Sequence, residues 1–388
     1  MKTPVYLDHH ATTPVDPRIL DLLQKVQRDH FGNPASSSHA FGWAAAKLVE
    51  EAREQVAQLI GATAHEIVFT SGATESNNLA LQGIAVRYAE QGDHLVTTVL
   101  EHEAVQAPLA QLSLAGWSVT RVSVGQDGIV DPADIAAALT ERTILVSVIA
   151  AQNEIGTLQP IRRIGALCRE RGVLLHTDAA QAVGKIGIDV EADNIDVLSL
   201  SGHKLYGPKG VGALYLRRRN PRVQVAPQIL GGGQERGLRA GTLNVPGIVA
   251  LGAACQLARR EMDTEAQRLR HLRQRLLQKL LSELDGMHLN GSAEQRLPGN
   301  LNLSFEGVMA HRLLAALTVL AVSSSSACSS AESQPSPVLT AIGVSPELAA
   351  ASLRIGLGRA TTAAEVDFAA EKIIAAVRKL RRENPRWQ

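Results

Sequence analysis

Apolar and polar positions along the first two-thirds of the chain follow a repeating order of strand and helix. Short, nearly continuous apolar runs predict strands at 66–70, 94–99, 118–124, 143–150, 172–177, 197–200 and 212–216. Helical spacing between them predicts helices at 16–30, 41–60, 79–91, 104–114, 132–139 and 161–171. Apolar strands separated by helices are typical of a mostly parallel sheet with helices on both faces. The pattern therefore predicts an α/β fold.

The last third of the chain predicts a smaller α+β unit. An Ala/Gly-rich helix at 246–260 passes with little break into a charged, Arg/Gln/Leu-rich helix at 261–284. Strands are expected at 300–305 and 352–357, and helices at 310–320, 346–351 and 365–382. The change in composition places a domain boundary near residue 260. We expect a large domain at 14–260 and a small domain made of 1–13 and 261–388.

Charge and composition exclude several classes of protein. The 388 residues include 39 basic and 38 acidic side chains, so the net charge of +1 provides no field for nucleic acid or an anionic membrane. No apolar run approaches the ~20 residues of a membrane span. The beginning of the chain lacks a secretory leader, so we expect a cytoplasmic protein. Three widely spaced cysteines do not form a metal site or a disulfide framework, and the pair His9-His10 is a poor metal site because adjacent side chains point apart.

The candidate chemistry centres on Lys204, which follows an apolar strand and precedes a Gly-Pro turn. A lysine at the tip of a buried strand is held away from water, which lowers the pKa of its ammonium and frees the amine to attack a carbonyl. A solvated loop lysine is the alternative. Ser201 and His203 favour the chemical interpretation, because they can bind an anion beside the amine. An amine next to phosphate donors suits pyridoxal phosphate, an aldehyde that carries a phosphate.

Further polar residues follow the predicted strands. The segment 71–74 lies between a strand and a helix, where backbone N–H groups can bind phosphate and Thr74 can add its hydroxyl; an ordinary capped helix is the alternative. Ligands of parallel sheets bind at the carboxyl ends of the strands. We therefore expect one shared site that contains Ser71, Ala73, Thr74, His102, Asn153, Asp178, Gln181, Ser201, His203 and Lys204.

Each remaining requirement of such a site has a candidate in the sequence. Asp178 would face the pyridine nitrogen and keep it protonated, and Gln181 would donate to the phenolic oxygen. His102 would cover the ring. Arg354, a charge inside an apolar strand, would bind a substrate carboxylate together with Asn153.

Two polar segments stand apart from the predicted elements. The glycine-rich loop 231–242 carries Arg236, Arg239 and Thr242, which can reach an anion. The serine-rich tract 323–337 contains two prolines and Cys328, and we expect it to be mobile. Free cysteines are usually buried, so a cysteine in such a tract favours a chemical role.

Nine segments together resemble the cysteine desulfurases of the NifS/IscS type, which are pyridoxal-phosphate enzymes with the fold of the class V aminotransferases. The segments are YLDHHATTP, FGNPASSSH, FTSGATESNN, EHEAV, NEIG, HTDAAQAVGK, SGHKLYGPKGVGALY, GGGQERGLRAGT and SSSSACSS. The resemblance covers nearly the whole chain. It implies a fold type I transferase that acts as a homodimer and converts L-cysteine to L-alanine. The sulfur would pass through a persulfide to an acceptor in iron–sulfur cluster assembly or in tRNA or cofactor thiolation.

The resemblance also implies roles for individual residues. Lys204 holds the cofactor and then acts as the base at Cα, and Cys328 is the nucleophile that takes the sulfur. With His102 they form the implied catalytic set. Ala73, Thr74, Ser201 and His203 hold the phosphate, and Thr242 reaches in from the other subunit.

Two departures and several alternatives accompany the resemblance. Ser325 replaces the family's usual glycine, which restricts the conformations of the cysteine tract. The chain also ends soon after Trp387, without the tail that IscS-type members use to dock an iron–sulfur scaffold, which makes that partner a weaker expectation. A selenocysteine lyase, another class V enzyme such as an aminotransferase, and a scaffold protein without cofactor stay open. Cys328 argues against the aminotransferase, and Lys204 with Asp178 argues against the scaffold.

Overall fold

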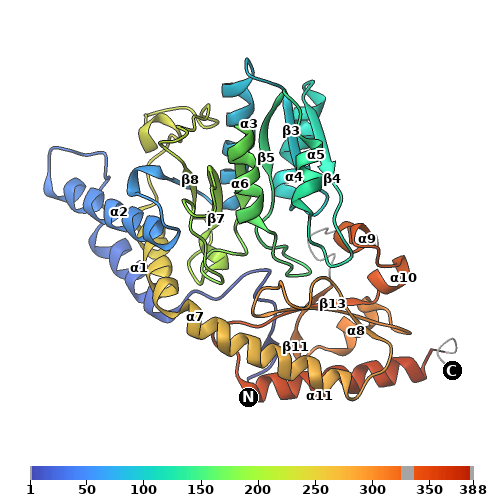
Figure 1. Cartoon of the computed structure of the whole chain (residues 1–388). Coiled ribbons are helices and arrows are strands. Elements are labelled where there is room, and N and C mark those ends of the chain that lie inside the picture. Colours follow the sequence, from blue (N-terminus) through green and yellow to red (C-terminus); the bar gives the residue numbers. More distant parts are fainter. Residues whose placement is uncertain (1, 325–335, 385–388) are drawn as a thin grey trace.

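A computed structural model describes residues 2–324 and 336–384, which form two lobes joined by a long helix (Figure 1). The large lobe is built on a seven-stranded sheet in the order β2-β8-β7-β6-β5-β3-β4. Its strands are β2 (Ile67–Thr70), β3 (His94–Thr98), β4 (Ser118–Val122), β5 (Thr143–Ser147), β6 (Leu174–Asp178), β7 (Val197–Ser201) and β8 (Gly212–Leu216). The five strands from β7 to β4 are parallel to one another. Strand β8 is antiparallel to both β7 and β2. The expected mostly parallel α/β fold is confirmed.

Helices cover both faces of this sheet because its strands are apolar on both sides. The helices are α1 (Pro17–Asp29), α2 (Ala40–Leu59), α3 (Ala73–Tyr88), α4 (Glu103–Leu114), α5 (Pro132–Ala138) and α6 (Ile161–Arg171). Ile67 and Phe69 of β2 pack into the core beneath α2, and Val68 between them packs on the opposite face against α3 and α4. This alternation divides the interior of the large lobe into two apolar layers.

The small lobe has its own sheet and core. Its sheet has the order β12-β13-β10-β9, with all pairs antiparallel, formed by β9 (Met287–Leu289), β10 (Asn300–Phe305), β12 (Ser323–Ser324) and β13 (Ser352–Gly356). Its helices are α8 (Ala310–Ala316), α9 (Pro337–Ala341), α10 (Pro346–Ala349) and α11 (Ala363–Arg382). The start of the chain joins this lobe, since β1 (Val5–Tyr6) pairs in parallel with β11 (Leu320–Ala321) and Leu7 lies in its core.

One continuous helix, α7 (Val245–Leu281, 37 residues), connects the lobes and replaces the two helices expected from the sequence. Its first half, up to Ala258, packs in the core of the large lobe, and its second half, from Leu269, packs in the core of the small lobe. The expected boundary near residue 260 falls between these two halves. The division into domains stays a prediction, although the two separate cores are what it would require.

One predicted helix is longer in the structure. The pattern predicted a helix from residue 79, whereas α3 begins at Ala73, directly after Gly72. The first turn was missed because its side chains are small and polar, which reflects the cavity that it borders. In the described part of the chain, no helix is both long and apolar enough to cross a membrane.

Close packing of α7 on α2 generates a stability prediction. A Cβ at Gly252 would lie 2.7 Å from the Cα of Ala52, which leaves no room for a side chain. We expect Gly252→Val to lower the free energy of unfolding by about 1–3 kcal/mol, because the two helices must separate. Thermal denaturation measures the change. Gly187→Ala is the matched control, since a Cβ there meets nothing within 4 Å; equal melting temperatures for both variants would contradict the prediction.

Candidate active site

The strand ends of the large lobe open into a cavity of about 480 Å³ that also touches the small lobe. Eleven of the residues expected in the site line it: Ser71, Ala73, Thr74, His102, Asn153, Asp178, Gln181, Ser201, His203, Lys204 and Arg354. Thr242 is exposed and is not among the lining residues. Cys328 lies outside the described residues. The expectation that a ligand site forms at the carboxyl ends of parallel strands therefore correctly grouped residues from five separate segments.

Lys204 sits on a short 3₁₀ turn, Gly202–Lys204, that ends β7. The turn is tight because the amide of Gly207 returns to the carbonyl of Gly202 at 2.9 Å. The Lys204 ammonium donates to the carbonyls of His10 (2.6 Å) and Ala11 (2.7 Å). These contacts hold the amine half-buried in the cavity wall, beside the start of the chain.

Asp178 ends β6 and is buried with both carboxylate oxygens engaged. Oδ2 accepts from the side-chain amide of Asn77 at 2.8 Å, and Oδ1 accepts from the backbone of Ala180 at 3.0 Å. Donors on both oxygens fix the direction of the carboxylate. The sequence analysis missed Asn77. It is a fully buried asparagine near the start of a helix, and nothing in the residues next to it indicates that its partner is Asp178.

A corner of the cavity that suits a phosphate forms where α3 begins. The N-terminus of this 16-residue helix has no side-chain cap, and Ala73 and Thr74 lie in its first turn at the cavity. Ser201 lies across from it, so close that a Cβ on Gly72 would be 3.7 Å from the Ser201 hydroxyl. Free backbone N–H groups, the helix dipole and hydroxyls are the donors that bind a phosphate.

His203 enters this corner as a neutral imidazole. Burial, and then the charges of Lys204 and Lys209, lower its pKa to about 4. Its Nδ1 lies 3.1 Å from the hydroxyl of Thr12. The ring therefore binds by hydrogen bonding and adds no positive charge near neutral pH.

The arginines of the glycine-rich loop contact other parts of the chain and do not line the cavity. Arg239 pairs with Glu75 at 2.8 Å, and Arg236 donates to the backbone carbonyl of Ile67 at 2.6 Å. Glu75 in turn accepts from the amide of Ser71 at 2.8 Å. Each of these arginines has an acceptor within its own chain, and their contacts secure the turn that begins α3. That either one also reaches a ligand anion stays a prediction.

Arg354 lies on β13 at the small-lobe side of the cavity, only 2% exposed. Its Nη2 donates to Asp8 at 3.0 Å and its Nη1 donates to the backbone carbonyl of Asn153 at 3.2 Å. Its Nε is a buried donor with no acceptor in the described part of the chain. The sequence suggested a ligand carboxylate as the partner of this buried charge and missed Asp8, whose other oxygen accepts from Ser323 at 2.7 Å.

These donors fit pyridoxal phosphate. The α3 N-terminus with two hydroxyls suits the phosphate, an amine in the wall suits the aldehyde, and a buried, fixed carboxylate suits a pyridinium nitrogen. A small-lobe arginine with a spare donor suits a substrate carboxylate. Across residues 2–324 and 336–384, no group of three or more His, Cys, Asp or Glu side chains is arranged to hold a metal ion.

Residues 5–368 match a family model described as Aminotransferase class-V. A protein from Anaeromyxobacter dehalogenans (strain 2CP-C) named "Cysteine desulfurase IscS" is 54% identical over 388 residues, covering 100% of this chain and 96% of the relative. One of the same name from Stutzerimonas stutzeri (strain A1501) is 52% identical over 389 residues, with the same two coverages.

Solved structures agree with these sequence relatives. A structure titled "NIFS-LIKE PROTEIN" superposes with a TM-score of 0.90 at 37% identity and covers 97% of this chain and 99% of its own. A structure titled "SspA in complex with cysteine" superposes with a TM-score of 0.80 at 37% identity and covers 91% and 98%.

Glu101, which precedes His102, generates a prediction about pH. Burial raises the pKa of its carboxyl to about 8, while its Oε1 accepts from Thr98 (2.7 Å) and from the amide of Ile149 (3.0 Å). Because the folded protein holds this proton and the unfolded chain releases it near pH 4.5, stability from this group is present below pH 4.5 and is lost as the pH rises to 8. Glu101→Gln keeps the acceptor oxygen without titrating. We expect its melting temperature, relative to wild type, to rise progressively between pH 5 and pH 8; a pH-independent difference would show that Glu101 is ionised throughout.

Proposed function

This chain belongs to the class-V aminotransferase family, and we propose that it is a pyridoxal-phosphate-dependent cysteine desulfurase that converts L-cysteine to L-alanine. The observation that carries the proposal is that Lys204, Asp178 and the α3 N-terminus line one cavity. The relatives named as cysteine desulfurases match this chain over its full length. The neighbouring structure titled as a complex with cysteine supports that substrate.

The cavity residues would hold the cofactor by three kinds of contact. Ala73, Thr74, Ser201 and His203 would bind its phosphate, and Lys204 would attach to its aldehyde. Asp178, held in place by Asn77, would pair with the ring nitrogen. When bound, the cofactor supplies a carbonyl that captures the substrate amine and a ring that accepts electrons from Cα.

Further residues would hold the rest of the cofactor and the substrate. Gln181 would donate to the phenolic oxygen, and His102 would cover the ring. The substrate carboxylate would lie between Arg354 and Asn153, where the free Nε of Arg354 offers a donor. Lys204 Nζ would take the proton from substrate Cα and return it to carbon. Its two carbonyl acceptors, on His10 and Ala11, favour the protonated amine between these steps.

The sulfur acceptor within the chain would be Cys328, by elimination as well as by resemblance. Cys168 and Cys255 are buried, and burial raises the pKa of both thiols, that of Cys168 to about 12. Only a thiolate attacks sulfur efficiently. The Cys328 thiolate would bond to the substrate sulfur as the Cβ–S bond breaks, with its electron pair remaining on carbon and a persulfide left on Cys328.

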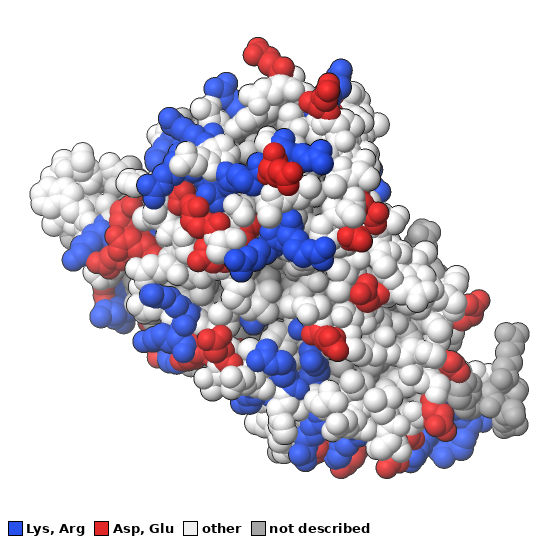
Figure 2. All heavy atoms as spheres, in the orientation of Figure 1, with Lys and Arg blue, Asp and Glu red and all other residues white. Residues whose placement is uncertain are grey.

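A second copy of the chain would complete the site. Thr242 is exposed outside the cavity of its own chain, as a residue contributed to a partner would be. The segment between α1 and α2, dark blue at the left of Figure 1, projects from the surface and carries no Lys, Arg, Asp or Glu (Figure 2). Phe31 in this segment (71% exposed) and Phe41 (56%) and Trp43 (58%) in the first turn of α2 form an exposed patch that suits burial in a homodimer.

The sulfur would next pass from Cys328 to an acceptor. The name IscS supports a protein acceptor in iron–sulfur cluster assembly, with thiolation pathways as the other destination. A location in the cytoplasm stays a prediction from the sequence.

The cysteine assignment has a direct test. We expect Cys328→Ala to bind pyridoxal phosphate normally but to release no more sulfide from cysteine than a protein-free blank, because no thiolate reaches the substrate sulfur. Cys255→Ala, at a buried position, is the matched control and should keep both alanine and sulfide production. Labelled cysteine with mass spectrometry of residue 328 identifies the persulfide. Full sulfide release by Cys328→Ala, or a colourless wild-type protein, would refute the proposed function.

The homodimer has a separate test by light scattering after size exclusion. We expect Phe31→Glu to weaken dimerisation by at least about tenfold, because an exposed anchor becomes a charge inside the interface. Leu114→Glu makes the same kind of change at the end of α4, where the side chain is 83% exposed, and should leave the mass unchanged. A wild-type monomer, or a Phe31→Glu dimer as tight as wild type, would refute this arrangement.

A further inference from the structure

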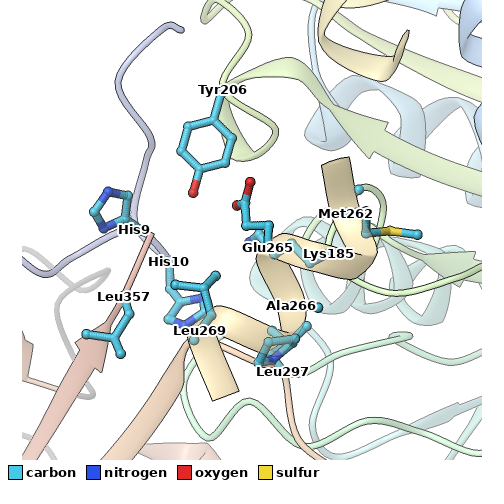
Figure 3. Close-up of a pocket in the computed structure, with 13 residues that line it drawn as sticks. His9, His10, Lys185, Tyr206, Met262, Glu265, Ala266, Leu269, Leu297 and Leu357 are labelled. Atoms are coloured by element: carbon cyan, nitrogen blue, oxygen red, sulfur yellow. The ribbon is translucent and has the colours of Figure 1, made fainter. Parts of the chain in front are cut away.

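A second, much smaller cavity shares a wall with the candidate active site, since His10 lines both. Its volume is about 20 Å³, enough for roughly one water molecule. Its polar lining consists of His9, His10, Lys185, Tyr206 and Glu265. Figure 3 shows Glu265 projecting from α7 toward the Tyr206 hydroxyl, with Lys185 beside it. No step of the proposed reaction uses Lys185, although it lies within reach of a residue that the reaction does use.

That residue is Gln181. The ammonium of Lys185 donates to the side-chain oxygen of Gln181 at 2.9 Å, from four residues further along the turn that follows β6. The side-chain nitrogen of Gln181 donates to the backbone carbonyl of His10 at 2.8 Å. The His10 ring Nδ1 lies 3.3 Å from the same side-chain oxygen. Gln181 is therefore held from both ends, with Lys185 on the side away from the cofactor cavity.

The identity of these partners determines which way the amide points. The Lys185 side chain donates to Gln181, so the Gln181 atom that faces it is the acceptor oxygen. The nitrogen then faces the other way, with one hydrogen directed to the His10 carbonyl and the second left for the cavity that Gln181 lines. A flipped amide would set its NH₂ group against the ammonium and its oxygen against the His10 carbonyl.

We propose that Lys185 is a positioning residue, which orients the Gln181 amide so that Nε2 donates to the phenolic oxygen of pyridoxal phosphate. This inference rests on the proposed function and adds a residue that acts through another, without contacting cofactor or substrate.

Burying the charged amine of Lys185 at this position costs free energy, and this supports a role for Lys185 beyond packing. Burial, and then the charges of Lys204 and Arg354, lower the pKa of Lys185 to about 7, with Glu265 acting in the opposite direction. An apolar side chain of the same length would fill this space without that cost. The nearby rings of His9 and His10 both have lowered pKa values, for which burial is the main cause, so they add little positive charge near neutral pH.

Lys185→Met tests the inference, because methionine keeps the length and removes the donor. The purified holoenzyme is titrated from pH 6 to pH 10 while the visible absorption of bound pyridoxal phosphate is recorded, and the cofactor dissociation constant is measured after dialysis. We expect the spectral midpoint to move upward by about 0.5–1 pH unit, because the phenolate loses a donor, and cofactor affinity to fall about threefold to tenfold. Met262→Leu, a volume-conserving change in the wall of the same small cavity, should alter neither quantity.

A double-mutant cycle separates orientation of Gln181 from a direct effect of the Lys185 charge. If Lys185 acts through the amide, Lys185→Met moves the midpoint by less than half as much in a Gln181→Leu background as in the wild type. Equal shifts in both backgrounds, or a Lys185→Met spectrum identical to wild type, would overturn the inference and leave the proposed function standing. A wild-type protein that binds no pyridoxal phosphate would overturn both.

Discussion

The first residues of the chain, 8–13, hold the two lobes in register around the cavity. Asp8 pairs with Arg354 of the small-lobe sheet, and the ring of His9 lies 2.9 Å from the carbonyl of Gly356 on the same strand. The carbonyls of His10 and Ala11 accept from Lys204, on the large lobe. This segment thus adds direct contacts between the strand that carries the arginine and the turn that carries the lysine. With it, the amine and the guanidinium lie in the wall of one small cavity, which is the geometry that a reaction at the α-carbon of an amino acid requires.

Electrostatics give this cavity its preference for anionic ligands. Lys204, Lys185 and Arg354 lie near enough to one another that the first and third lower the pKa of the second. Among the nearby carboxylates, Asp178 is engaged by Asn77, Asp8 by Arg354 and Glu75 by Arg239. The N-terminus of α3 adds the positive end of its dipole. A ligand that carries a phosphate and a carboxylate relieves this concentration of positive charge, whereas a neutral ligand would not.

Rigidity comes from parts of the chain that never touch the cavity. Helix α7 packs its first half on α2 and its second half on α11, so a single rigid rod belongs to both hydrophobic cores. The strand β8 lies so close to the turn at Gly72 that Gly212 could not carry a side chain, because a Cβ there would be 2.6 Å from the Gly72 Cα. These contacts fix the corner at the start of α3 and the distance between the lobes. Because the corner is held from outside, backbone N–H groups and short side chains are enough to form a phosphate site there.

The sequence by itself determined the order of strands and helices in the large lobe, the α/β class and eleven of the cavity residues, because periodicity and strand ends are local properties that survive without knowledge of the partner. Only the tertiary structure decided which groups meet across long separations. Asp8 finds Arg354, Asn77 finds Asp178, and Lys185 fixes Gln181 against His10. It also showed that Arg239 pairs with Glu75 and that 245–281 is one helix. Such pairings depend on where separate segments cross in space, and a hydrogen bond between atoms 3 Å apart leaves no pattern in the residues next to either of them.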